Sequence, residues 1–235
     1  MFKLSGKLRT LRNKAFKGIL STFLLLLVIS VAQVVTIKYI NPPFTLPMVW
    51  EWVLKKSTGR PFKPFAYEWK DIEDISHHLQ RAVLAAEDQR FLSHNGFDFI
   101  ELRRIFKEFM DRGRIRGGST ISMQAARSLY LIPCRSVIRK ALEAWYTIFM
   151  EIFWDKKRIL EIYLNCVDWG YGIVGAEAAA KSYYGCGATE LDAAQSAMMT
   201  AILPAPHRLS PSNPDQYLIS RQQRILKDMP LMPQL

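Results

Sequence analysis

The chain of 235 residues has little cysteine and no acidic residue before Glu51. Its three cysteines, Cys134, Cys166 and Cys186, show no CxxC spacing, which excludes a disulfide framework and a zinc finger. One bridge with a free thiol and three free thiols both stay open. The four histidines form no HExxH pattern, and no GxSxG frame is present, so neither a zinc protease nor a serine hydrolase of that type is indicated.

The charge balance is strongly basic. The chain has 32 Lys and Arg against 21 Asp and Glu, a formal net charge of +11. Such a balance favours anionic partners: nucleic acid, anionic lipid headgroups or phosphorylated substrates. No zinc-finger spacing or aromatic-basic RNA signature is visible, so no nucleic acid partner is predicted. The hydrophobic share of 49% is enough for a packed core, which argues against wholesale disorder.

One long uncharged run lies near the N-terminus. Residues 1–17 form a basic tail, and Gly18 to Ile37 carry no charge. As a helix rising about 1.5 Å per residue, this run spans about 30 Å, the thickness of the bilayer core. The basic flank predicts a cytoplasmic N-terminus, with everything after Lys38 outside. A cleaved signal peptide is the alternative, but the run is long for one and no small-x-small site follows, so we predict a retained anchor.

The segment 38–70 is rich in proline and aromatic residues. Its prolines rule out one long helix. Its aromatic side chains could pack on the domain or lie at the membrane interface, and both alternatives stay open. A short amphipathic stretch from Met48 to Leu54 fits either of them.

The remainder, residues 71–235, is predicted to be almost entirely helical, without a run of alternating strands. Leu79, Val83 and Ala86 recur at helical spacing, and Asp155 is placed to open a later helix. The capping-box pattern of residues 189–192 predicts a further helix, which Pro204 would stop.

Two glutamates stand out by their position. Glu87 extends the apolar stripe of its helix, and a carboxylate on such a buried edge suits proton transfer. The alternative is a surface glutamate paired with Arg90. Glu143 follows Arg139 by four residues and Lys140 by three, which also fits an ordinary helical ion pair.

A glycine-rich stretch lies between the two glutamates. Ser119 stands where a phosphate loop needs lysine, which excludes nucleotide hydrolysis. A Gly-Ser-Thr turn opening a helix still offers backbone N–H groups and hydroxyls to an anion. Basic residues surround it in sequence, although a solvated basic face stays open as the alternative. They are Arg114, Arg116, Arg127, Arg135, Arg139 and Lys140.

Taken together, these stretches resemble the peptidoglycan glycosyltransferases of the glycosyltransferase 51 family, over roughly residues 82–201. Five motifs occur in the family's order. They are Glu87-Asp88-Gln89-Arg90-Phe91 with His94 and Gly96, then Gly117-Gly118-Ser119-Thr120-Ile121-Ser122-Met123-Gln124, then Arg139-Lys140-Ala141-Leu142-Glu143, then residues 156–165, and lastly residues 172–185. The second motif departs from the family's usual Thr-Gln-Gln at Ser122-Met123-Gln124, so no polar role is predicted for Met123.

The chain contains neither SxxK nor KTG, the signature of the transpeptidase domain in the bifunctional relatives, class A penicillin-binding proteins. It therefore resembles the monofunctional biosynthetic form. The resemblance implies a mainly α fold: a lysozyme-like helical domain over residues 71–235 with a small membrane-proximal jaw subdomain near residues 97–115.

The resemblance also implies a reaction. The enzyme would polymerise lipid II into glycan strands with inversion and release undecaprenyl diphosphate. Glu87 would be the general base, and Glu143 would act at the departing side through a proton, a bound cation or a basic neighbour that it orients. The residues expected to bind substrate are Ser119, Thr120, Gln124, Arg127, Arg135, Arg139 and Lys140.

The remaining expectations concern cofactors, partners and location. No protein metal site is predicted, while a divalent cation, Mg²⁺ or Mn²⁺, stays open at the diphosphate. The expected partners are lipid II, the lipid-linked glycan, the membrane and other cell-wall synthesis proteins. The expected location is the cytoplasmic (inner) membrane, single-pass, with a periplasmic catalytic domain. A lysozyme-like glycoside hydrolase or lytic enzyme and a non-catalytic cell-wall scaffold are the alternative functions.

Overall fold

The computed structural model describes residues 2–59, 61–113 and 117–235. Two compact units divide the chain, Met1–Ile40 and Asn41–Leu235. The first unit is the helix α1 (Phe2–Tyr39), of which the part from Asn13 to Tyr39 is long and apolar enough to cross a membrane. The helix starts earlier than predicted, because Lys and Arg are good helix formers and no proline interrupts the basic tail.

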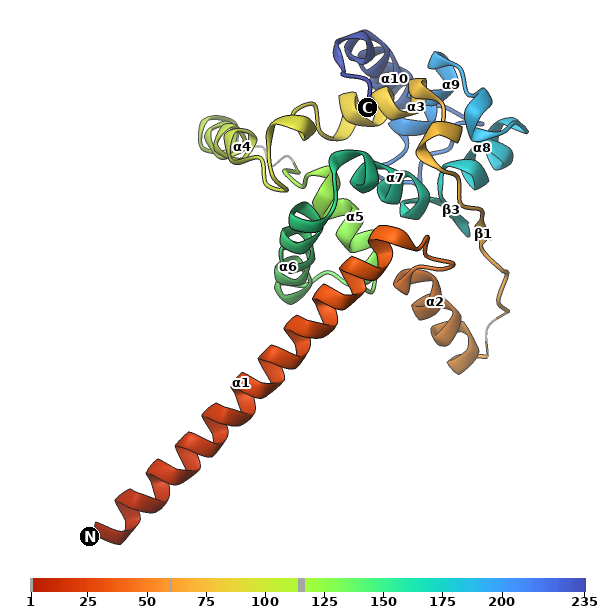
Figure 1. Cartoon of the computed structure of the whole chain (residues 1–235). Helices are drawn as coiled ribbons and strands as arrows, with labels where there is room; N and C mark the ends of the chain where they lie inside the picture. The colour runs from red at the N-terminus through yellow and green to blue at the C-terminus, as the bar shows by residue number, and fades with distance from the viewer. Residues whose placement is uncertain (1, 60, 114–116) are drawn as a thin grey trace. The chain divides into compact units, whose positions relative to one another are not determined.

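The second unit is mainly helical, as the sequence predicts (Figure 1). Short 3-10 turns connect several of its helices. The α-helices in its described part are α2 (Leu46–Ser57), α3 (His77–Glu87), α4 (Phe99–Arg112), α5 (Ile121–Tyr130), α6 (Val137–Phe153), α7 (Lys156–Cys166), α8 (Ala176–Tyr184), α9 (Ala193–Ala201) and α10 (Gln216–Asp228).

A small sheet, which the sequence analysis does not predict, closes one side of this unit. Its strands are β1 (Ala66–Tyr67), β2 (Asp168–Gly170) and β3 (Ile173–Val174), in the order β1-β3-β2. β1 runs parallel to β3, and β2 runs antiparallel to it. Strands of two or three residues are too short to show an alternating pattern, which explains why the sequence does not reveal them.

The core is centred on α7. Every residue from 159 to 166 is buried, so this helix is surrounded instead of lying on the surface. α5 packs against α7 and α6, and α9 packs against α3 and α10. These contacts hold the C-terminus of α3 and the N-terminus of α5 at the centre of the unit, where Glu87 and the glycine-rich stretch lie.

In the second unit, one predicted helix start is confirmed and one is corrected. Asp155 caps α7 as predicted, by accepting a hydrogen bond from the amide of Arg158. The capping box that opens α9 is formed by Asp192 and Gln195, whereas Thr189 lies in the preceding 3-10 turn. The box is therefore shifted by three residues, because two overlapping patterns compete for the same short stretch.

The region expected to form the jaw contains α4. This helix begins after Asp98, whose carboxylate caps it, and ends at Gly113, and its outer side has exposed apolar residues. Arg114, Ile115 and Arg116 lie outside the described residues. The jaw assignment itself stays a prediction.

Gly96 joins the first motif to α6 at a point without space for a side chain. Its φ of +83° lies in the region that favours glycine, and a Cβ there would lie 2.6 Å from Cγ2 of Thr147. Gly185 has a similar φ of +69°, but a Cβ there would meet nothing within 4 Å. Substitutions at both positions strain the backbone, but only a substitution at Gly96 also creates a steric overlap, so comparing the two separates these effects.

We expect Gly96→Ala to lower the free energy of unfolding by about 1–3 kcal/mol more than Gly185→Ala, since both strain the backbone but only the first creates an overlap. Thermal unfolding of the full-length variants in detergent measures the difference. Equal losses of stability in the two variants would show that α6 yields to the added methyl group.

Candidate active site

A cleft of about 780 Å³ runs past the end of α3. Its walls come from the C-terminus of α3, the N-terminus of α5, one side of α4 and one face of α10. Glu87, Ser119, Thr120, Gln124 and Arg127 all line it. The structure thus brings the first predicted motif and the second to a common surface.

Glu87 lies at the last position of α3, with 15% of its side chain exposed. Nε2 of Gln124 donates to Oε2 of Glu87 at 3.0 Å, and Nη2 of Arg221 donates to Oε1 at 3.1 Å. Arg127 in turn donates to Oε1 of Gln124 at 3.4 Å. The alternative pairing with Arg90 is wrong, since Arg90 binds Asp98 instead. The carboxylate of Glu87 is therefore held from two sides while it still reaches the cleft.

A chain of polar contacts leads from this carboxylate to the second glutamate. Nε2 of Gln124 also lies 3.5 Å from the backbone oxygen of Ser119, whose hydroxyl accepts a hydrogen bond from Nζ of Lys140 at 2.6 Å. Nζ of Lys140 lies 3.0 Å from Oε2 of Glu143. The two glutamates are thus joined through Gln124, Ser119 and Lys140, which come from two different predicted motifs.

Glu143 itself is buried and does not line the cleft. Only 1% of its side chain is exposed, and it forms ion pairs with Arg139 and Lys140. The helical ion pair considered from the sequence is therefore present. Because it is buried, removing one of its partners should cost more stability than removing a partner of a surface pair. Of the roles left open for Glu143, this geometry favours orienting a basic neighbour.

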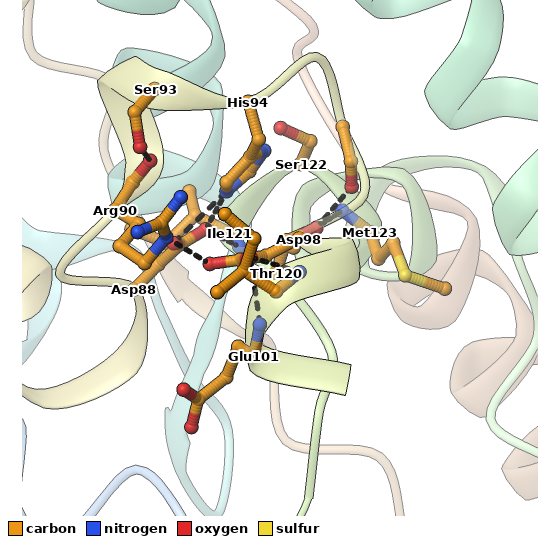
Figure 2. A network of polar contacts seen from close by, with 12 residues as sticks. Asp88, Arg90, Ser93, His94, Asp98, Glu101, Thr120, Ile121, Ser122 and Met123 are labelled. Carbon is orange, nitrogen blue, oxygen red and sulfur yellow. Dashed lines mark hydrogen bonds and ion pairs between the residues drawn. The ribbon is translucent and has the colours of Figure 1, made fainter. Parts of the chain in front are cut away.

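Asp88, next to Glu87, connects the two walls of the site (Figure 2). Its Oδ2 accepts a hydrogen bond from the amide of Ile121 at 3.0 Å, and its Oδ1 lies 3.0 Å from Nε2 of His94. Thr120 donates to the backbone oxygen of Gly96 at 2.6 Å. These contacts fix the end of α3 to the start of α5, which sets the distance between Glu87 and the glycine-rich stretch.

Asp88, His94 and Asp98 form the one group among the described residues whose geometry suits a metal ion, with ligand atoms within 4.8 Å of one another. Their carboxylates are already engaged, however. The carboxylate of Asp88 binds the amide of Ile121 and the imidazole of His94. The carboxylate of Asp98 binds Arg90 and the two amides at the start of α4. The group fits a structural hydrogen-bond network better than a cation site. A cation at the diphosphate stays a prediction.

Asp98 is a carboxylate whose charged form the fold stabilises. Burial is the largest influence and acts to raise its pKa. The amides of Glu101 and Ile100 and the charges of Arg90 and His94 together act more strongly in the other direction, so the pKa of Asp98 lies below its usual range. The ionised form is therefore the one that caps α4.

We expect Asp98→Asn to retain the cap, because asparagine caps helices well, but to lose the charge that Arg90 binds. Since the folded-state pKa is lowered, the wild-type carboxylate stabilises the fold above the ordinary aspartate pKa of about 3.9, and this contribution disappears as the pH falls through the folded-state value. The variant should be the less stable protein at neutral pH, with a gap that narrows on acidification. Thermal unfolding across a pH series measures the gap, and a constant gap would contradict this account.

The other predicted binding residues are distributed unevenly. The Thr120 hydroxyl donates to the backbone oxygen of Gly96 and accepts from the amide of Met123, so it stabilises the backbone around the site. Met123 is buried, in line with the prediction that it has no polar role. Arg135 is exposed and lines no part of the cleft.

Sequence reasoning missed Arg221, which lies 134 residues from Glu87 in the chain. The signal in the sequence is a stripe on α10, at helical spacing, that faces the cleft: Tyr217, Arg221, Arg224, Ile225 and Asp228. The stripe mixes charged, aromatic and apolar types, so nothing local distinguishes it from a solvated face.

The cleft is not basic as a whole, although the chain is. Its lining includes five arginines and five acidic residues, whose formal charges cancel. These are Arg90, Arg104, Arg127, Arg221 and Arg224, and Glu87, Asp88, Asp98, Glu101 and Asp228. Next to Ser119, by contrast, Lys140 approaches from α6, and Lys140 and Arg139 together carry one positive charge more than their shared partner Glu143.

Comparisons with known proteins identify the family of the chain. The sequence model of the family described as Transglycosylase matches residues 56–230. A biosynthetic peptidoglycan transglycosylase of Caulobacter vibrioides is 42% identical over 219 residues, which cover 93% of this chain and 91% of that protein. Proteins of the same description from Shewanella oneidensis and Aeromonas hydrophila are 41% and 39% identical, covering 85% and 96% of this chain and 84% and 94% of their own. The predicted resemblance is confirmed: the chain belongs to the transglycosylase family and is a glycosyltransferase of peptidoglycan biosynthesis.

Proposed function

We propose that this glycosyltransferase polymerises lipid II into glycan strands, with the growing lipid-linked chain as donor. The acceptor would be the 4-hydroxyl of the N-acetylglucosamine of an incoming lipid II. Its oxygen attacks C1 of the donor, the bond from C1 to the diphosphate oxygen breaks, and undecaprenyl diphosphate leaves with the electron pair. The observation that supports this most directly is the Glu87 carboxylate, held by Gln124 and Arg221 at the edge of a cleft.

Glu87 would act as the general base. It takes the proton of the acceptor hydroxyl as the new bond forms, a step that requires an ionised carboxylate at a fixed position. Hydrogen bonds from Gln124 and Arg221 fix both oxygens of this carboxylate. One face of the donor sugar meets the acceptor and the other releases the diphosphate, so the reaction proceeds with inversion and needs no covalent intermediate.

The diphosphate would lie near Ser119, at the end of the cleft that Lys140 approaches. The leaving group is already a good one, so it needs stabilisation of charge more than protonation. Lys140 and Arg139 supply positive charge, and the buried Glu143 holds both in place. Glu143 is therefore a positioning residue in this proposal. Arg127, from within the cleft, would add charge on the donor side.

The anchor gives the reaction its location. We propose that α1 crosses the cytoplasmic membrane with its basic N-terminus inside and the catalytic unit on the outer, periplasmic side. Because lipid II diffuses within the membrane, tethering raises the local concentration of enzyme and substrate.

Labelled lipid II with the purified full-length protein in detergent tests this function. The expected product is a long polymer that lysozyme degrades, in parallel reactions with EDTA and with added Mg²⁺ or Mn²⁺. The biosynthetic relatives already favour transfer over the hydrolase and scaffold alternatives. Release of sugars from polymeric peptidoglycan without any polymer from lipid II would overturn the proposal.

We expect Arg221→Gln to lower turnover at saturating lipid II by about 10–100-fold, because a hydrogen bond to a charged group is worth about 1.5–3 kcal/mol. Arg221→Lys should recover part of the loss, since it keeps the charge but not the planar donor fork. Arg224→Gln, on the same face of α10, is the matched control and should leave turnover unchanged. Equal losses in Arg221→Gln and Arg224→Gln would show a general effect of charge in the cleft instead of positioning of Glu87.

A further inference from the structure

The helix α2 does not bury its apolar face. Leu46, Trp50, Val53 and Leu54 recur at the spacing of one helical face, and between 36% and 43% of each is exposed. The other face contains Met48, Glu51 and Lys55, and each of these is half-buried. A surface helix of a soluble domain normally turns its apolar face inward.

The inner face of α2 explains how the helix is held in this orientation. α2 packs against α5, and it begins with a Pro at its N-terminus, where the missing N–H has no cost. Nζ of Lys55 lies 2.6 Å from Oε1 of Glu51, so the inward face is neutral through its own ion pair. The outward apolar face is therefore a fixed feature of the second unit, at the end opposite to α10 (Figure 1).

We propose that this outward face of α2 lies in the interfacial layer of a phospholipid membrane, as a second point of attachment beside α1. The connection between the two helices, residues 40–45, reaches at most about 20 Å even when fully extended. A helix tethered this closely to a membrane-length helix has the bilayer surface within reach. The proposal depends on α1 being inserted in that membrane, but not on the reaction in the cleft.

Aromatic and basic residues on this face and beside it fit a lipid surface. Trp50 and Trp52 are of the type that concentrates at the boundary between headgroups and acyl chains. Nζ of Lys56 lies 4.9 Å from the ring centroid of Trp52, which places positive charge beside the apolar face. Basic residues in this position attract anionic headgroups. A protein partner would need no such flanking charge, so the observations favour lipid.

Depth-dependent quenching in the full-length protein tests this inference. The three native cysteines are replaced, Cys134→Ser, Cys166→Ala and Cys186→Ala, and single cysteines are introduced by Val53→Cys, Leu25→Cys or Gln223→Cys for an environment-sensitive fluorophore. Leu25 lies within the apolar part of α1 and reports insertion, and Gln223 is an exposed residue of α10 that serves as control. A thermal unfolding transition in detergent that matches the one of the unlabelled protein shows that each labelled protein is folded. The vesicles mix zwitterionic and anionic phospholipids and contain a quencher at a shallow or a deep position of the acyl chain.

The expected result is quenching at position 53 with the shallow quencher more effective than the deep one, since an interfacial helix lies about 5–10 Å into the boundary. Position 25 should show the reverse order, and position 223 no quenching. Absence of quenching at position 53, with normal quenching at 25, would overturn the proposal and leave the face for a protein partner or a second copy of the chain. Absence of quenching at position 25 would remove the anchor on which the proposal depends, and with it the proposal.

Discussion

Glu87→Gln is expected to reduce lipid II polymerisation by about 10²–10⁴-fold, because the amide cannot take the proton of the acceptor hydroxyl. Glutamine has nearly the same shape, and the side chain is only 15% exposed, so the local packing should survive. Glutamine has one acceptor oxygen where glutamate has two, so Gln124 or Arg221 loses its hydrogen-bond partner on this side chain. Both residues line the cleft, so the donor that is released stays accessible to water. The measurement is the initial rate of polymer formation from labelled lipid II, with products resolved by size.

Glu101→Gln is the matched control, because Glu101 lines the same cleft from α4 and the change removes the same charge. We expect that variant to retain most of its activity. Thermal unfolding of both variants shows whether either has lost its fold. Abundant lysozyme-sensitive polymer from Glu87→Gln would keep the function but remove Glu87 from the role of base.

Glu143→Leu is expected to lower the free energy of unfolding by about 3 kcal/mol, since removing one partner of a buried ion pair leaves the other charge uncompensated. The value lies at the lower end of the usual range because Lys140 is 47% exposed and keeps much of its hydration. Arg139, which is 18% exposed, bears most of the loss. Activity should fall as well, because Lys140 is no longer held next to Ser119.

Stability and activity can be separated by a second change. Arg139→Met together with Glu143→Leu removes both charges of the most buried pair, and replacing a buried pair by apolar residues is often neutral for stability. We expect this double variant to regain most of its thermal stability but not its rate of polymerisation. Glu68→Gln, in an exposed pair with Lys181, should change neither. Recovery of full activity in the double variant would exclude a role for Glu143 in positioning the basic residues.

Much of the candidate site follows from the sequence because its motifs are local. The spacing of Glu87 from Val83 and Leu79 placed it on a buried edge, and the structure has it at the cleft with both neighbours in the core. The predicted anion-binding turn is the N-terminus of α5, capped by Thr120. Caps and helical stripes depend on residues within one or two turns, and a sequence displays these directly.

The sequence by itself determined the helical class, the membrane-length segment, the motifs and their order, because each depends on periodicity or on residues a few positions apart. The tertiary structure decided which groups meet. It brings Arg221 of α10 to Glu87 and Lys140 of α6 to Ser119, buries Glu143, balances the charges of the cleft and turns the apolar face of α2 outward. These depend on how whole helices pack against one another, and a charged residue on a helix looks the same in sequence whether it faces water, a substrate or a buried partner.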